Sequence, residues 1–371
     1  MQRIVYYFPE KDTYMYKWQR VHIIDEMAHY GFKFDTFNPL KYPAIEDSYE
    51  DLISFVKKNP PVLFLACICS KRHLGIDVLE EIKRLGVPTL SFRPDNLAIP
   101  YNDRELGRHF DLLWLTDKQT KGLYDKWGIK NYVAPYAANP FFFKRENLPL
   151  VDRACFIGTV HGSRAKMINR IAQEKEIEID IYDKKSIRPT CDNENKVVLP
   201  TRGRLHEAAD KIKFSVGRKL LLSAFLNRHI CKQTELENKD NIHHLSSVPF
   251  EEVSTVYSSY RLSLSSTSYH DTDVLRHPVS VVNLRGFEIP MCGGLQFCRW
   301  NDELAEYFED GKEIVMYRDD EEMMDKLSYY LFSASEREIV EMKAAARARA
   351  EKDHIWLKRF EPAFREFGIK Y

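Results

Sequence analysis

The sequence predicts an α/β protein built from two consecutive Rossmann-like, doubly wound domains. Short apolar β-type runs alternate with helical patterns along the chain, which is the rhythm of a parallel sheet covered by helices. A proline-containing stretch at 135–149 interrupts this rhythm, and a fresh strand follows it. The 371 residues also exceed the roughly 100 to 200 of one domain. We therefore expect domains at 1–145 and 146–345, with a final helical segment at 346–371.

The first domain is predicted to alternate strand and helix from its start. Strands are expected at 4–8, 32–37, 62–69, 88–92, 112–116 and 132–135, and helices at 18–30, 49–58, 74–85 and 118–127. In such a parallel sheet, ligands bind at the carboxyl ends of the strands.

The second domain is predicted to repeat this pattern. A strand at 154–157 runs into a turn with glycine and serine, and a helix follows from Arg164. Further strands are expected at 177–182, 262–264, 295–298 and 313–316, and helices at 204–232, 250–257, from 302, from 321 and at 336–358. The polar segment at 184–201 lacks periodicity and is predicted to be a loop.

Charge and composition argue against several classes of partner. Lys plus Arg and Asp plus Glu both number 55, so no global field would gather nucleic acid or an anionic membrane. The longest apolar run, 62–69, is far shorter than the roughly 20 residues that cross a bilayer. Seven cysteines without a Cys-x-x-Cys pair are typical of a reducing compartment. We expect a cytoplasmic protein without a stable anchor, whose basic residues at 347–359 lie on a solvated helix or, alternatively, approach a membrane.

The usual signatures of other α/β enzymes do not occur. No Gly-x-Gly-x-x-Gly follows the first strand, and neither Gly-Lys-Ser nor Gly-Lys-Thr is present, which disfavours dinucleotide and P-loop enzymes. The motifs His-Glu-x-x-His and Gly-x-Ser-x-Gly are also missing, which disfavours a zinc hydrolase and a serine hydrolase with a nucleophile elbow.

One stretch carries a specific pattern. Arg285 and Glu288 are followed by Gly293-Gly294, a short strand and a second strand with Gly-x-Glu at 311–313. Upstream, Phe156-Ile-Gly158 ends a strand and is followed by Arg164. These features resemble the CgeB-like (spore maturation protein) glycosyltransferases, which are relatives of glycosyltransferase family 4. The resemblance covers most of the chain and is weakest at 184–240.

The resemblance implies a GT-B fold, with two Rossmann-like domains facing a central cleft and a C-terminal helix that crosses back to the first domain. It also implies a nucleoside-diphosphate sugar, such as a UDP-sugar, as the donor. The first domain would bind the acceptor and the second domain the donor.

The residue chemistry agrees with a donor site in the second domain. Glu288 can accept two hydrogen bonds from a ribose diol, and Arg164 and Arg285 can stabilise a leaving diphosphate without a metal. Gly158 would let the backbone approach the phosphates. Gly293 is included in the site, although it can also be a turn glycine at a helix end. For Glu288 and Arg285, a structural ion pair is the alternative.

One departure concerns the donor sugar. Family 4 enzymes generally place another Glu eight residues before the ribose-binding one, where this chain has Ser280. Sugar contacts are expected instead from Asn283 or from the loop with His270, Asp271 and Asp273. The last two spell the Asp-x-Asp of metal-dependent GT-A transferases, but no suitable strand precedes them. We interpret them as solvated loop residues and expect no metal site.

In the first domain, polar residues follow two predicted strands. Asp95 and Arg93 end the strand at 88–92 and are candidates for contacts with the acceptor or the oxocarbenium-like transition state; a turn Asp after proline is the alternative. Lys71, Arg72 and His73 follow the strand at 62–69 and would meet an anionic acceptor unless they are plain surface charges.

These observations predict a glycosyltransferase that transfers a hexose or similar sugar to a hydroxyl, with retention and without a cofactor. Glycans, proteins and small molecules are the expected acceptors, and the zero net charge disfavours nucleic acid. Two alternatives remain: a nucleotide-sugar epimerase on the same fold, and a non-catalytic nucleotide-sugar-binding module, which Ser280 favours.

Overall fold

The computed structural model describes residues 1–11, 14–68, 73–183, 203–231 and 234–371. The chain divides into two units, the first formed by Met1–Pro135, Asp192–Arg218 and Trp356–Tyr371, and the second by Tyr136–Cys191 and Lys219–Ile355. The first unit thus takes in later segments, whereas the sequence pattern placed one boundary at 145. The predicted loop at 184–201, together with Lys71 and Arg72, lies outside the described residues.

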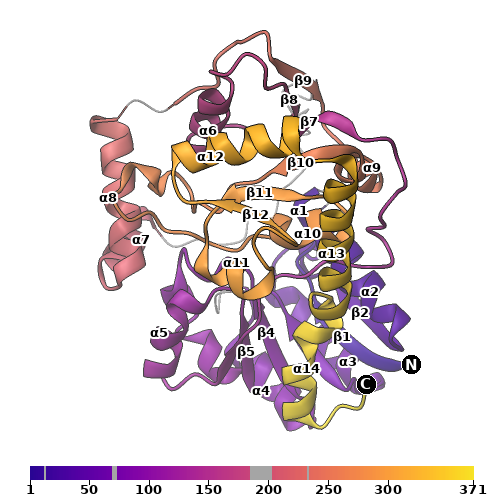
Figure 1. Cartoon of the computed structure of the whole chain (residues 1–371). Helices are drawn as coiled ribbons and strands as arrows, with labels where there is room; N and C mark the ends of the chain where they lie inside the picture. Colours follow the sequence, from indigo (N-terminus) through magenta and orange to yellow (C-terminus); the bar gives the residue numbers. More distant parts are fainter. Residues whose placement is uncertain (12–13, 69–72, 184–202, 232–233) are drawn as a thin grey trace. The chain divides into compact units, whose positions relative to one another are not determined.

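The first unit contains a six-stranded parallel sheet in the order β2-β1-β3-β4-β5-β6 (Figure 1). The strands are β1 (Gln2–Tyr7), β2 (Phe32–Phe37), β3 (Leu63–Ala66), β4 (Thr89–Arg93), β5 (Leu112–Leu115) and β6 (Asn131–Val133). Its helices are α1 (Tyr14–Gln19), α2 (Asp25–His29), α3 (Tyr49–Lys58), α4 (Ile76–Arg84), α5 (Lys121–Lys126), α7 (Arg204–Ile212) and α14 (Trp356–Phe367).

The second unit contains another six-stranded parallel sheet, in the order β12-β11-β10-β7-β8-β9. The strands are β7 (Val151–Ile157), β8 (Ile179–Asp183), β9 (Ile242–Ser246), β10 (Tyr260–Leu264), β11 (Gln296–Arg299) and β12 (Val315–Tyr317). The helices are α6 (Ser163–Ile171), α9 (Val253–Ser259), α10 (Arg285–Met291), α11 (Asp302–Tyr307), α12 (Asp320–Ser328) and α13 (Glu336–Asp353); α8 (Ser215–His229) begins in the first unit and continues into the second.

Several elements differ from the sequence-based expectation. The helix expected at 204–232 is the two helices α7 and α8, and the one expected at 18–30 is divided between α1, a π-helical segment at Arg20–Ile24 and α2. Strand β9 was not predicted, because only Ile242 of its five residues is buried, and His243, His244 and Ser246 leave no regular apolar alternation. The single helix expected at 336–358 is two helices, because the backbone of His354 leaves the helical conformation. The His354 side chain is buried against the rings of Phe287 and Phe308, which holds the end of α13 in the second unit.

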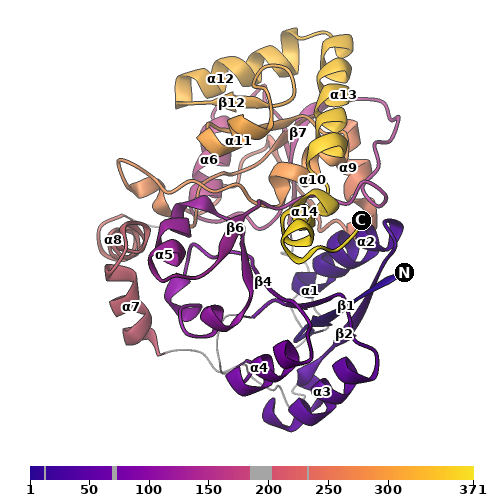
Figure 2. The same cartoon turned by 90° about the horizontal axis from the view of Figure 1, so that it is seen from below.

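Helix α14 supplies aromatic side chains to the core of the first unit. Trp356 and Phe360 are fully buried, and their rings lie 5.8 and 5.1 Å from that of Trp114 on β5. Phe364 stacks on Phe32 of β2 at 4.7 Å. Figure 2 shows α14 beside α2, in agreement with their contacts. The last helix is therefore an integral layer of the first unit.

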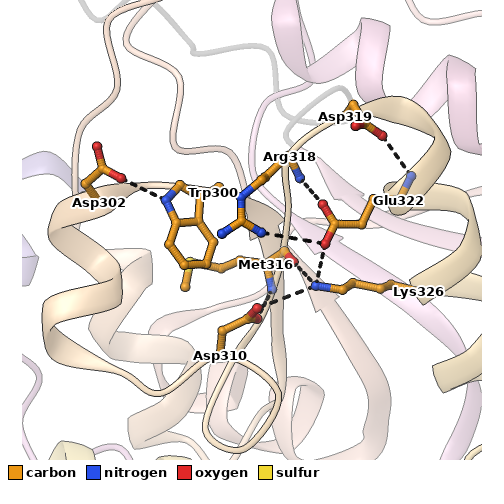
Figure 3. A network of polar contacts seen from close by, with 8 residues as sticks. All are labelled: Trp300, Asp302, Asp310, Met316, Arg318, Asp319, Glu322 and Lys326. Carbon is orange, nitrogen blue, oxygen red and sulfur yellow. Dashed lines mark hydrogen bonds and ion pairs between the residues drawn. The ribbon is translucent and has the colours of Figure 1, made fainter.

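A network of charged side chains fixes the edge of the second sheet (Figure 3). Glu322 of α12 accepts a hydrogen bond from the backbone N–H of Arg318 at 2.7 Å and pairs with Lys326 at 2.9 Å. The guanidinium of Arg318 lies 3.9 Å from the ring centre of Trp300, which directly follows β11. The network thus joins the carboxyl ends of β11 and β12 to the first turns of α12.

Three of the basic residues near the C-terminus, Arg347, Arg349 and Arg359, have partners within the fold. Arg347 pairs with Glu351, and Arg349 pairs with Glu313 at 3.2 Å. Arg359 is buried and donates to a backbone carbonyl at 3.1 Å. These side chains do not form an open basic surface. Among the described residues, no helix is both long and apolar enough to cross a bilayer.

Candidate functional site

The second sheet has a topological switch point between β7 and β10. After β7 the chain adds β8 and β9 on one side, and after β10 it adds β11 and β12 on the other. Ligands bind to open α/β sheets at the carboxyl ends of such strands. A cavity of about 150 Å³ lies there and is lined by Gly158, which follows β7, and by Ser265 and Ser266, which follow β10.

Two arginines from different helices line this cavity. Arg164 belongs to the first turn of α6, and Arg285 is the first residue of α10. Burial, and after it the positive charge of Arg285, lowers the pKa of Arg164 below its usual value. Asn283 also lines the cavity and donates to the carbonyl of Ser266 at 2.8 Å. A buried anion between the two guanidinium groups would relieve their mutual repulsion.

Glu288 lies one helical turn after Arg285 and is 1% exposed. Its Oε2 accepts a hydrogen bond from Nη1 of Arg285. Glu288 is not among the side chains that line the 150 Å³ cavity, whereas Arg285 is. Glu288 therefore does not line the cavity itself, but it binds the guanidinium of Arg285, which does.

The turn between β7 and α6 requires glycine. Gly158 has φ +140° and Gly162 has φ +55°, and L residues rarely adopt either conformation. A Cβ at Gly162 would lie 1.7 Å from Oδ1 of Asp271, which accepts from the N–H of Ser163 at 3.3 Å. The Asp271 loop is thus packed directly on the first turn of α6.

Gly293 occupies the opposite end of α10 from Arg285. It has φ +73°, and its N–H donates to the carbonyl of Pro290 at 2.9 Å, as in a glycine-terminated helix. A Cβ there would meet the side chain of Arg145 at 2.5 Å. The structure does not place Gly293 on the cavity wall.

The other loop candidates have separate partners. Asp273 accepts from the hydroxyl of Ser268 at 2.7 Å, while Asp271 caps α6. His270 has a positive φ of 48°, and Ser280 pairs with Ser268 in an isolated bridge. Within the described ranges, no group of three or more His, Cys, Asp or Glu side chains is arranged to hold a metal.

A second, larger cavity adjoins the first and was not anticipated. It measures about 300 Å³, shares Ser265 and Ser266 with the smaller one, and follows α6 past Lys166 and Arg170 to Arg299 at the end of β11. Together the cavities reach the size range of small-molecule sites. The serine-rich run directly after β10 was the available signal, because it places hydroxyls at the carboxyl end of a central strand.

In the first unit, the two candidates after β4 differ in environment. Arg93 is buried and its Nη2 lies 2.6 Å from Oδ1 of Asp103, so it forms a structural ion pair. Burial raises the pKa of Asp103, and Arg93 opposes that rise. Asp95 is exposed and has φ +53°, an uncommon value for a non-glycine residue. His73 is buried, and its backbone carbonyl accepts from the Tyr7 hydroxyl at 2.7 Å.

Residues 203–364 match the model of a family described as glycosyl transferase-like. The match includes Arg285 and Glu288, begins after Arg164 and spans less than half of the chain. No curated protein gives a significant sequence match.

Solved structures match nearly the whole chain. Sucrose-phosphate synthase from Thermosynechococcus elongatus is 11% identical with a TM-score of 0.59, over 99% of this chain and 98% of its own. HepE from Anabaena, solved with UDP and glucose, is 9% identical with a TM-score of 0.59, over 99% and 100%. A glycosyltransferase from Rickettsia africae is 10% identical with a TM-score of 0.58, over 99% and 97%.

The chain has the GT-B glycosyltransferase fold. The fold class predicted from the sequence is confirmed by the two parallel sheets and by these full-length matches. At 9 to 11% identity, the similarity concerns the GT-B fold itself. The cavity with Arg164 and Arg285 lies in the C-terminal sheet of this fold.

Proposed function

We propose that the chain is a glycosyltransferase that binds a nucleoside-diphosphate sugar in the second unit and transfers the sugar to a hydroxyl group. The observation that carries the proposal is the convergence of Arg164 and Arg285, from two helices, on one cavity at the switch point of a GT-B sheet. Diphosphate is the anion that two nearby guanidinium groups suit, because each can bind phosphate oxygens through a planar fork of N–H donors.

The reaction needs charge stabilisation more than a catalytic dyad. The bond between the anomeric carbon and the diphosphate breaks, a bond to the acceptor oxygen forms, and the acceptor proton passes to a phosphate oxygen. Arg164 and Arg285 would stabilise the charge that develops on the leaving diphosphate. We propose that the transfer proceeds with retention and without a metal, and that hexose is the transferred group.

The comparisons support this proposal at the level of fold and partial family match. HepE was solved with UDP and with UDP-glucose, so a UDP-sugar is the first donor to test. We also propose that the chain is CgeB-like within the relatives of family 4, on the motif from Arg285 to Gly294. Asp95 is proposed to contact the acceptor, because it is exposed at the carboxyl end of β4.

A thermal-shift panel tests donor binding directly. UDP, GDP, ADP, CMP and dTDP are compared with and without EDTA, and one of them should raise the melting temperature in both conditions. Arg164→Ala should weaken binding at least tenfold, or about 1.4 kcal/mol, and Arg164→Lys should recover only part of it. Arg337→Ala, which removes an exposed arginine from α13, is the matched control and should bind as wild type does.

Two further results would change the assignment. If Arg164→Ala and Arg285→Ala both leave the nucleotide affinity unchanged, the cavity is not the nucleotide-binding site. Nucleotide binding without release of nucleoside diphosphate, across a panel of hydroxyl acceptors, would instead indicate the non-catalytic binding module. NMR of any glycoside product gives the anomeric configuration, and an inverted product would contradict retention.

A further inference from the structure

Helix α8 has one side packed in the fold and an apolar side turned outward. Leu220 and Ser223 are buried, and Asn227 donates to the carbonyl of Asp271 at 2.8 Å. At 3.6 residues per turn, Leu222 and Phe225 point in the opposite direction from these three. They are 51% and 56% exposed. Within the described part of the chain, the outward side of the helix is therefore apolar and uncovered.

This exposure is a feature of the helix rather than scattered surface. Ile230, directly after α8, is also exposed, and Leu221 and Leu226 are partly exposed beside the two outward residues. A folded protein gains nothing from placing several large apolar side chains together in water. An outward apolar side of this kind marks a surface that binds something.

The charges of α8 indicate what covers this side. Its 15 residues include Arg218, Lys219 and Arg228 but neither Asp nor Glu, in a chain with equal numbers of acidic and basic residues. Arg218 and Arg228 are exposed and precede and follow Leu222 and Phe225 on the helix, and Arg218 also donates to the carbonyl of Ile212 at 3.0 Å. His229 is also exposed, and its ring lies 5.0 Å from that of Phe225. An apolar centre with cations at both ends complements an anionic surface that has an apolar interior.

We propose that the outward side of α8, formed by Arg218, Leu222, Phe225 and Arg228, docks on an anionic lipid bilayer. Leu222 and Phe225 enter the boundary between headgroups and acyl chains, and the arginines bind lipid phosphates in the plane of the interface. Arg347, Arg349 and Arg359 are engaged elsewhere in the fold. Helix α8, by contrast, presents exposed cations beside an exposed apolar side. This inference does not depend on the proposed function, because it concerns adsorption and not turnover.

The test is co-sedimentation of the full chain with vesicles of phosphatidylcholine alone and of phosphatidylcholine with 30% phosphatidylglycerol, at low and high salt. Binding should require the anionic lipid and should fall as salt screens the arginines. Leu222→Ser with Phe225→Ser should lower the partition coefficient at least tenfold. Arg218→Gln with Arg228→Gln should lower it and remove most of the salt dependence.

Two further variants test whether the occupant is a lipid surface and whether binding is specific to α8. Phe225→Trp should bind vesicles at least as well as wild type, because an interface accepts any large aromatic side chain. Tyr329→Ser with Phe332→Ser, which removes two residues of similar exposure away from α8, should leave binding unchanged. Circular dichroism of each variant checks that the fold is intact.

Three outcomes would overturn the proposal. One is equal sedimentation with neutral and anionic vesicles, or none with either. Another is a dimer in sedimentation velocity that the Leu222→Ser and Phe225→Ser changes dissolve, which would make a second copy the occupant. The third is binding that survives the loss of both apolar side chains.

Discussion

The ion pair between Arg285 and Glu288 gives the carboxylate two possible parts in nucleotide binding. If Glu288 accepts the ribose hydroxyls, as the sequence predicts, Glu288→Gln should weaken the binding of UDP at least tenfold and that of inorganic pyrophosphate much less. If it only orients Arg285, both ligands should weaken together. Calorimetric titration of wild type and variant with the two ligands distinguishes these cases. Parallel losses would withdraw the ribose assignment while keeping the phosphate site.

A substitution at Gly162 tests whether the turn before α6 requires glycine. Alanine there must adopt φ +55° and displace the Asp271 carboxylate from the N–H of Ser163. Gly162→Ala should therefore lower the free energy of unfolding by about 1 to 3 kcal/mol in urea denaturation. The control is Gly122→Ala in α5, where a Cβ meets nothing within 4 Å. It should be neutral or stabilise by about 0.5 to 1 kcal/mol, and equal losses at both sites would refute the argument.

Glu26 links α2 to α14 and makes the first unit sensitive to pH. Its Oε1 accepts from the N–H of Leu357 at 3.0 Å, and burial raises its pKa from an ordinary 4.5 to about 8. Because the folded-state pKa is the higher one, this group stabilises the fold fully below pH 4.5. That contribution is lost as pH rises through 8.

We accordingly expect Glu26→Gln to have a higher free energy of unfolding than wild type at alkaline pH. The variant keeps an oxygen for Leu357 but cannot ionise, so its stability relative to wild type should grow between pH 5 and pH 9 by roughly 4 kcal/mol. Denaturant unfolding at several pH values measures this difference. Glu50→Gln, on the exposed side of α3, should show no such divergence, and a parallel pH profile for Glu26→Gln would contradict the linkage.

The elements that the sequence predicted best are those whose periodicity reports local burial. Strand β2 and helix α3 match the predicted bounds, and the cavity residues Gly158 and Arg164 stand at element ends that the pattern located. Strand β9 was not predicted because its backbone pairing with β8, and not a periodicity of its own side chains, makes it a strand. Pairings across long loops, such as that of Arg93 with Asp103, leave no periodic trace, so the burial of Arg93 was not foreseeable.

Each unit is formed from segments that are far apart in the sequence. The stability of the first unit therefore depends on residues near the C-terminus. The first unit is formed from three separate segments, the last of which is α14. Trp356, Phe360 and Phe364 are fully buried there. At about 1.5 to 3 kcal/mol each, their burial is comparable to the 5 to 15 kcal/mol that stabilises a typical domain. The N-terminal sheet is thus expected to depend on the last helix of the chain.

A chain that ends at Ile355 should consequently lose the first unit's cooperative unfolding transition, while one that ends at Phe367 keeps it. Near-ultraviolet circular dichroism reports on this unit, because Trp18, Trp114 and Trp127 remain in it after the truncation, which removes Trp356, and only Trp300 belongs to the second unit. We expect the shorter chain to lose most of that signal and to be cleaved rapidly by protease within residues 1–135. Since α13 ends at Asp353, the second unit retains its own elements in this truncation and should still unfold cooperatively. A near-ultraviolet spectrum from the shorter chain that lacks no more than the contribution of Trp356 would mean that the first sheet is stable without α14.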